Sequence, residues 1–176
     1  MPIIYPKTII ISEICPHPSG GTDNEFIELY NSGNEDVDLS GWFLDDIDGG
    51  STPYEIPQNT KIGPKKYLAF YRSVTGIALN DTGGDSARLL FPDKTEAFVL
   101  SYDENASLGS SLYQLDLWTT TPTPGSENII TLPIQEEIQI EEPINTVPIE
   151  IPTGSFEDYL NKLVKVTGKV TSTSGN

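Results

Sequence analysis

Carboxylate side chains are the residues of this chain whose number and spacing could support chemistry. The 176 residues include 26 Asp or Glu and only 10 Lys or Arg. Glu13, Glu25 and Glu28 lie on or beside predicted strands, and glycoside hydrolysis requires two carboxyls about 5–10 Å apart across a cleft. Glu25 and Glu28 are three positions apart, so a regular strand directs them to opposite faces. We therefore expect solvent-facing carboxylates, one of them capping a neighbouring backbone, and predict no catalytic site.

The acidic turn at residues 45–50 raises the question of calcium, because Ca²⁺ binds oxygen ligands clustered on a loop. An EF-hand register that places Gly49 at its sixth position requires an oxygen ligand at Leu44, which has none. The acidic residues on the other ligand positions of that register are Asp46, Asp48 and Glu55. The sequence favours a solvated acidic turn and no resident cofactor. A looser calcium site is the alternative, with the candidate ligands Asp45, Asp46 and Asp48.

Residues typical of nucleophilic catalysis or transition-metal binding are scarce. The chain has one Cys and one His, which excludes a disulfide scaffold and any site built from several cysteines or histidines. His17 lies between two prolines, where we expect a surface turn, and the sequence has no Gly-x-Ser-x-Gly nucleophile elbow. Cys15 is expected to serve as a small buried hydrophobe, which is the usual role of a lone cysteine.

The two tryptophans could form an exposed binding patch, although tryptophans more often fill a core. Trp42 lies in the apolar segment 41–44, predicted as a strand, and is expected to be buried. Trp118 lies in a Thr- and Pro-rich segment that we predict to be a loop. There it would clamp the end of the chain onto the domain.

Short strands must position all of these residues, since no stretch of 10–12 residues shows helical apolar spacing. β-branched or alternating segments are separated by clusters of Gly, Pro, Asn and Asp, which are turn formers. The predicted strands are residues 9–15, 25–30, 41–44, 67–71, 87–91, 96–102 and 111–115. This pattern predicts an all-β sandwich or barrel. A domain of about 129 residues can bury roughly two thirds of its unfolded surface, which is sufficient for one core.

Composition divides the chain into three parts: residues 1–129, 130–153 and 154–176. The middle part has seven Ile, five Glu and four Pro, without Gly, aromatic or basic residues. Frequent prolines remove ladder donors, so we predict an extended linker, with an edge strand on a neighbour as the alternative. The pattern of residues 154–176 predicts one helical turn and one strand. These two elements alone cannot bury their apolar side chains in a core. We expect them to begin an incomplete second domain of a longer protein.

Charge and hydropathy exclude several functions. A net charge of −16 argues against a phosphate-binding surface, which needs clustered Lys and Arg. No apolar run reaches the roughly 18 residues of a membrane-spanning helix. The first seven residues lack the basic start and the long apolar core of a signal peptide.

An ordered set of motifs runs through residues 9–129. They are ISEI (11–14) with PHP (16–18), NEFIELYN (24–31), VDLSGWFLDD (37–46), IGP (62–64) before Tyr67-Leu68, LN (79–80) before DSARL (85–89), and Trp118 before PTPGSEN (122–128). In this order the motifs resemble a lamin tail domain of the bacterial kind. The resemblance implies an immunoglobulin-like β-sandwich, in agreement with the strands predicted from alternation and turns.

The resemblance also implies a function, because lamin tail domains are interaction or structural modules rather than enzymes. They occur in secreted or surface-attached bacterial proteins and beside nucleases. We therefore expect a non-catalytic module of a larger extracellular or cell-surface protein that contacts a protein or a surface polymer. A cytoplasmic location is the alternative. The sequence has no coiled-coil heptads, so the nuclear-filament role of eukaryotic lamins does not carry over.

Two alternative functions remain open at the level of sequence. Residues 163–171 resemble the first strand of an OB-fold, a fold that binds oligonucleotides or oligosaccharides. The domain that begins near residue 154 would then touch nucleic acid, and residues 1–129 would be an accessory to it. The second alternative is a calcium-dependent adhesion module that uses the acidic turn.

Overall fold

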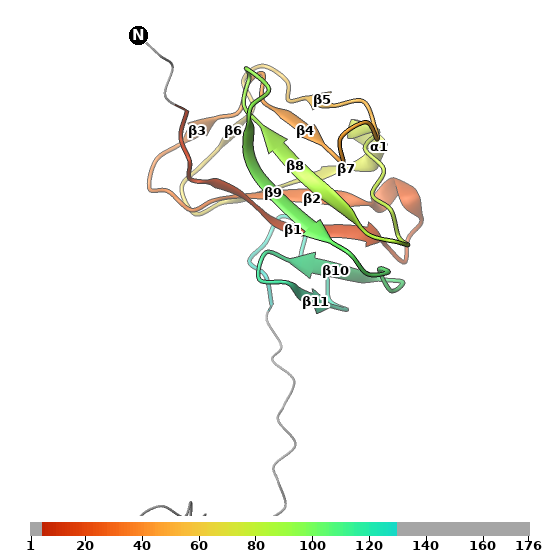
Figure 1. The fold of residues 1–176 in the computed structure, drawn as a ribbon. Coiled ribbons are helices and arrows are strands. Elements are labelled where there is room, and N and C mark those ends of the chain that lie inside the picture. The colour runs from red at the N-terminus through yellow and green to blue at the C-terminus, as the bar shows by residue number, and fades with distance from the viewer. Residues whose placement is uncertain (1–4, 130–176) are drawn as a thin grey trace, which may run out of the picture. The chain divides into compact units, whose positions relative to one another are not determined.

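Short antiparallel strands form two main sheets, as the alternation predicts (Figure 1). The structure is a computed structural model, and it describes residues 5–129. The predicted linker at 130–153, the predicted second-domain segment at 154–176 and its OB-like strand lie outside the described residues. Within residues 5–129, no helix is long and apolar enough to cross a membrane.

The larger sheet is built around a long first strand that has a neighbour on each side. Its strands, in spatial order, are β11 (Leu117–Thr119), β10 (Ser110–Tyr113), β1 (Ile9–His17), β2 (Phe26–Asn31) and β7 (Tyr67–Tyr71). Side chains on both faces of β1 are buried, with Ile11 and Ile14 on the core face and Glu13 on the other face, all at 0% exposure. A strand buried on both faces requires cover on its second face, and residues 121–128 supply part of it.

The smaller sheet packs against the larger one. Its strands, in spatial order, are β5 (Tyr54–Glu55), β4 (Phe43–Asp45), β8 (Asp85–Leu90) and β9 (Glu96–Tyr102). The remaining elements are the paired strands β3 (Val37–Asp38) and β6 (Lys61–Ile62), the 3₁₀ turn η1 (Thr22–Asn24) and the single-turn helix α1 (Arg72–Thr75). Ala87 and Leu89 of β8 and Leu100 of β9 face the core, as predicted from period-two alternation.

One hydrophobic core lies between the two sheets and confirms the predicted sandwich. It combines Ile11 and Leu29 of the larger sheet with Leu44 and Leu89 of the smaller sheet, all at 0% exposure. The core continues into an aromatic cluster of Tyr5, Trp42 and Phe91. Phe91 stacks on Tyr5 at 4.6 Å and meets Trp42 edge-on at 4.8 Å between ring centroids, which are favoured arrangements of aromatic pairs.

A tight turn directs Trp42 into that core. The Trp42 N–H donates to the carbonyl of Leu39 at 3.0 Å, and Gly41 between them has a φ of +74°. Positive φ is cheap only for glycine, so the Ser-Gly-Trp sequence specifies this turn. The predicted burial of Trp42 is confirmed, at 2% exposure, but its predicted place within a strand is wrong, because β4 begins one residue later.

Differences from the predicted strands occur where elements are very short or irregular. Strands β7 and β9 have the predicted bounds, whereas β3, β5, β6 and β11 have only two or three residues each and escape any periodicity test. The predicted loop around Trp118 is wrong, since this residue is the middle of β11. The predicted turn at His17 is also wrong. Strand β1 continues through Pro16 because the register towards β10 shifts there, and proline is tolerated at such bulges.

Candidate functional site

Two glutamates on neighbouring strands form the carboxylate pair that most resembles a catalytic arrangement. Glu13 of β1 lies directly opposite Glu28 of β2 in the antiparallel register, so the two side chains share a face. Both are at 0% exposure. The expectation of solvent-facing carboxylates is therefore wrong for this pair. The Ile-rich segments around them explain the burial, because both faces of β1 and most of β2 are covered.

Backbone and hydroxyl donors saturate this pair. Glu13 accepts hydrogen bonds from Ser111 Oγ, from Thr123 Oγ1 at 2.9 Å and from the Thr123 N–H at 3.1 Å. Glu28 accepts from Ser12 Oγ at 2.7 Å and from the Gly125 N–H at 2.6 Å. The expected role of a glutamate in capping a neighbouring backbone is confirmed. A pair so enclosed has no free face for a substrate.

These hydrogen bonds fasten residues 121–128, which we call the closing segment, over strands β1 and β2. The Asn128 amide donates to the carbonyl of Ser12 at 2.9 Å, and the Tyr113 hydroxyl donates to the carbonyl of Thr121 at 3.1 Å. The closing segment is thus held on the sandwich mainly by the two buried carboxylates, whereas the sequence predicts the clamping role for Trp118.

Burial also changes the acidity of the pair. Removal from water raises the pKa of Glu28 to about 7, against the opposing effect of its hydrogen bonds, and the neighbouring Glu13 charge adds to the increase. Desolvation likewise raises the pKa of Glu13, while hydrogen bonds from Ser111 and Thr123 oppose the increase. Glu28 therefore responds to pH near neutrality, although its side chain is fully buried.

The third glutamate has a separate structural role. Glu25 precedes β2 and is 3% exposed, so the expectation that it faces solvent is wrong. It forms an ion pair with Arg72 at 2.5 Å and accepts the Leu79 N–H at 3.0 Å. Desolvation raises the pKa of Glu25, and the hydrogen bonds from Arg72 and Leu79 oppose that change. Glu25 therefore joins helix α1 and the segment after it to the larger sheet.

The acidic turn is only partly solvated. Asp48 is fully exposed as expected, but Asp45 and Asp46 are buried at 3% and 4% exposure, and there the expectation is wrong. Asp45 pairs with Arg88, and Asp46 accepts the Ser51 N–H at 2.8 Å. Among residues 5–129 there is no group of three His, Cys, Asp or Glu placed to hold a metal ion. Calcium binding at this turn stays an untested alternative.

His17 and Cys15 both support the structure of β1. The His17 ring lies 3.1 Å from the Ala106 carbonyl and 3.7 Å from an Asp81 carboxylate oxygen, so it fastens two loops to the strand end. Cys15 is 1% exposed, which confirms the predicted small buried hydrophobe. Burial raises the pKa of its thiol to about 12, so the reactive thiolate is not formed at neutral pH.

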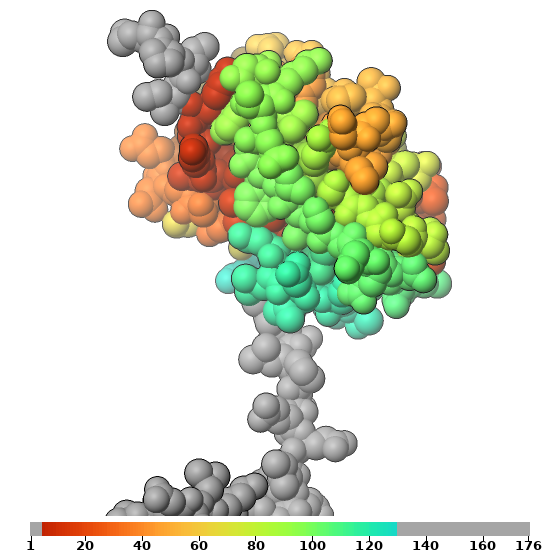
Figure 2. Space-filling model, in the orientation of Figure 1, coloured from red at the N-terminus to blue at the C-terminus, as the bar shows by residue number. Residues whose placement is uncertain are grey.

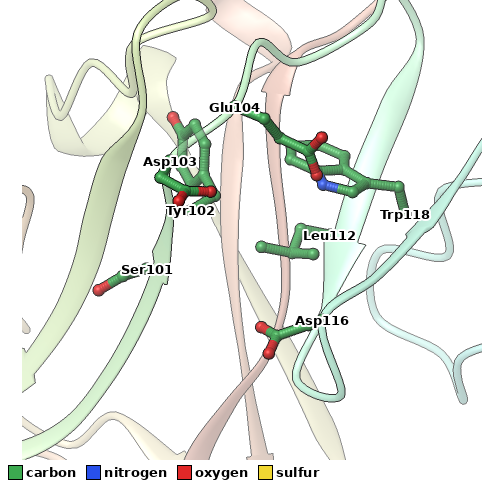
Figure 3. Close-up of a pocket in the computed structure, with 7 residues that line it drawn as sticks. All are labelled: Ser101, Tyr102, Asp103, Glu104, Leu112, Asp116 and Trp118. Atoms are coloured by element: carbon green, nitrogen blue, oxygen red, sulfur yellow. The ribbon is translucent and has the colours of Figure 1, made fainter.

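An open groove lies between strand β9 and the β10–β11 hairpin (Figure 3). It has a volume of about 440 Å³. Its apolar lining consists of Tyr102, Leu112 and Trp118, and its acidic lining consists of Asp103, Glu104 and Asp116. The Trp118 and Tyr102 rings meet edge-on at 5.7 Å. Residues of β9 and of the hairpin border one another on this face of the molecule (Figure 2).

A second hollow of about 240 Å³ continues this groove and shares Glu104 and Trp118 with it. Its other lining residues are Asn105, Ser107, Ser110, Thr119 and Thr120. We call the two hollows together the Trp118 groove. The half-buried Trp118 lines both hollows. The exposed part of its side chain therefore faces the groove.

The comparison with protein families identifies the domain. The family model described as Lamin Tail Domain matches residues 5–105, more than half of the chain. The chain belongs to the lamin tail domain family. No curated protein matches the chain.

This lamin tail domain has the immunoglobulin-like β-sandwich that the motifs predict. The family is generally non-catalytic and of the interaction type, which agrees with the closed state of the Glu13–Glu28 pair. The family match ends at residue 105, whereas the sequence motifs suggested similarity through residue 129. Strands β10 and β11, the closing segment and Trp118 all lie beyond the match.

The acidic side of the Trp118 groove escaped the sequence analysis. Asp103 and Glu104 look like an ordinary turn after β9, and Asp116 stands alone between two short strands. No local signal brings them together, because the groove exists only once the hairpin packs beside the end of β9. The alternative of a patch formed by two exposed tryptophans is not realised, because Trp42 is buried and Trp118 is half-buried.

Proposed function

We propose that this lamin tail domain is a non-catalytic protein-binding module of a larger protein. The observation that carries the proposal is the commitment of its buried carboxylates to structural hydrogen bonds and ion pairs. Glu13, Glu28 and Glu25 each hold backbone donors from distant segments, and general acid–base catalysis requires a carboxyl within reach of a substrate proton. Because these buried carboxylates are all occupied by internal hydrogen bonds, the sandwich is suited to binding a partner on its surface rather than to catalysis.

The first experiment tests the absence of catalysis. The purified 176-residue chain is assayed on chromogenic esters, phosphodiesters and glycosides beside the variant Glu13→Gln/Glu28→Gln. We expect wild type and variant to give the same background rate. Hydrolysis by the wild type that is lost in the variant, with both proteins folded by circular dichroism, would contradict the proposal.

A second experiment tests binding. The chain is incubated with proteins and with polymers of the cell envelope of its source organism, and contacts are recorded by lysine cross-linking and by co-sedimentation. The cross-linker can attach to three exposed side chains, Lys61, Lys65 and Lys94. We expect reproducible cross-links to a protein partner. If the chain co-sediments only with a polymer, the partner is a surface polymer rather than a protein. If it is recovered with neither, an interaction role is refuted.

The proposed setting is outside the cell or on its surface. The similarity to domains of secreted bacterial proteins supports this location. Immunodetection of the native protein in culture medium, envelope and cytoplasmic fractions provides the test, and confinement to the cytoplasmic fraction would contradict it.

A further inference from the structure

We propose that the Trp118 groove binds an extended, basic segment of a partner protein, with a Lys or Arg side chain placed against the Trp118 indole. The inference rests on the proposed protein-binding function and specifies its surface and the chemistry of its partner. Four features of the described residues support it.

The first feature is the combination of an aromatic surface with carboxylates on either side. Figure 3 shows the Glu104 carboxylate beside the indole of Trp118, and Asp116 on the other side of Leu112. Cations bind the faces of tryptophan rings more strongly than those of other aromatic residues. A nearby carboxylate adds direct Coulomb attraction for the same cation.

The second feature is that this negative charge is not neutralised. Within residues 5–129, the ion pairs involve His17, Arg72 and Arg88 on the basic side, and none includes Asp103, Glu104 or Asp116. Among the residues that the structure describes, no basic residue lines either hollow. The chain as a whole has a net charge of −16. Complementary charge is what selects and steers a partner to such a surface.

The third feature is the backbone at the rim of the groove. Within residues 5–129, strands β9 and β11 are end strands of their sheets, one from each layer of the sandwich. An end strand has unpaired N–H and C=O groups along its outer side, which an extended peptide can use for main-chain hydrogen bonds. This backbone favours an extended segment of protein over a free amine.

The fourth feature is exposed apolar surface beside the groove. Leu115 immediately precedes Asp116 in the β10–β11 turn and is 67% exposed, and Leu108 lies between two lining residues and is 65% exposed. Together the hollows offer about 440 and 240 Å³, enough for several side chains. The fitting segment therefore alternates basic and apolar residues.

Tryptophan fluorescence of the full 176-residue chain can test this, because Trp42 is buried and Trp118 is half-buried in the groove. The probe is an acetylated and amidated peptide of three Arg-Leu repeats, and its control has three Glu-Leu repeats. We expect saturable fluorescence change with the basic peptide, weakening as salt increases, and none with the acidic peptide. The same response in Trp118→Phe, or no response in wild type, would overturn the proposal.

Matched charge variants separate the groove from general acidity. Glu104→Gln/Asp116→Asn removes two charges from the groove, and Glu35→Gln/Asp36→Asn removes two from the exposed β2–β3 loop. All four side chains are exposed, so both variants should fold. We expect at least a tenfold loss of affinity in the groove variant and less than a twofold loss in the loop variant. Equal losses would show diffuse attraction and refute the groove.

The same variants distinguish this inference from the proposed function. If the envelope cross-links persist in Glu104→Gln/Asp116→Asn at wild-type level, the domain binds its partner through another surface, so the groove fails and the protein-binding function stands. If wild type gives no partner and no peptide response, both fail.

Discussion

At the scale of single residues, this lamin tail domain uses buried polar side chains to satisfy backbone groups far away in sequence. Within residues 5–129, every buried side-chain nitrogen or oxygen has a hydrogen-bond partner. Glu13 reaches Thr123, which is 110 positions away. An unsatisfied buried group destabilises the fold by about 1–3 kcal/mol. These residues are therefore structural, although their type and pairing resemble an active site.

Glu28 should make the stability of the domain dependent on pH. Its pKa rises from 4.5 to about 7 on folding. Between pH 4.5 and pH 7, the folded state therefore keeps a proton on Glu28 that the unfolded state has lost. The contribution of Glu28 to stability is therefore fully present below pH 4.5 and is lost as the pH rises through 7. In urea unfolding at pH 5 and pH 8, Glu28→Gln should gain stability relative to wild type as the pH increases.

The comparison at each pH isolates Glu28 from groups with the opposite behaviour. Asp38 and Asp93 have a lowered pKa because of hydrogen bonds from Ser40 and Thr95, and they are present in both proteins. Glu35→Gln on the exposed loop is the control and should follow wild type. Parallel stability profiles of wild type and Glu28→Gln would contradict the prediction.

Asn31 should be one of the most sensitive positions for stability. Its amide donates to the carbonyls of Glu35 at 2.7 Å and Ile62 at 3.1 Å, and its oxygen accepts the Gly33 N–H at 2.9 Å. Asn31→Ala leaves the buried Ile62 carbonyl and the partly exposed Glu35 carbonyl and Gly33 N–H without this partner, which should lower the free energy of unfolding by about 1–3 kcal/mol. Urea denaturation measures this. The exposed Asn34→Ala should change it by less than about 0.5 kcal/mol, and an equally small effect of Asn31→Ala would contradict the prediction.

At the scale of elements, the last hairpin completes a sheet that the matched family region leaves open. Strand β10 pairs with β1 through Glu13, Ile14 and His17, and its residues Leu112 and Tyr113 are buried. Without β10, the side of β1 opposite β2 would lose its partner. The domain therefore extends past residue 105, the end of the family match.

A chain that ends at residue 105 should fail to fold cooperatively. Truncation removes the β10 ladder, the buried surface of Leu112 and the Ser111 and Thr123 donors to Glu13, and a buried carboxylate without partners is strongly destabilising. Urea titration followed by tryptophan fluorescence should give no sigmoidal transition, in contrast to the 176-residue chain. A cooperative transition in the short chain would show that the hairpin is an appendage.

At the scale of the whole molecule, negative charge dominates, and its distribution decides what it can bind. Asp45 and Asp46 are committed to Arg88 and Ser51, whereas within residues 5–129 no ion pair involves the carboxylates of the Trp118 groove. The charges of Asp45 and Asp46 therefore support the fold, whereas the carboxylates of the groove are available to a partner.

Calcium should therefore have no specific effect on stability. The alternative adhesion function requires a calcium site at residues 45–48, and a ligand that binds only the folded state raises the melting temperature. We expect melting temperatures in millimolar CaCl₂ and MgCl₂ to agree within about 1 °C at equal ionic strength. A saturable increase with calcium that Asp48→Asn removes would establish the site and the adhesion alternative.

The sequence by itself determined the fold class and most of the core. Alternation in β7, β8 and β9 is a local property, because period two is set by residues adjacent in the chain. The ordered motifs identified the family. Only the tertiary structure decided that Glu13 and Glu28 are buried and opposed, that Trp118 lies in a strand, and that three scattered carboxylates surround one groove. Those outcomes depend on contacts between different strands and segments, from Leu112 with Trp118 in one hairpin to Glu13 with the distant Ser111 and Thr123, and no local pattern records them.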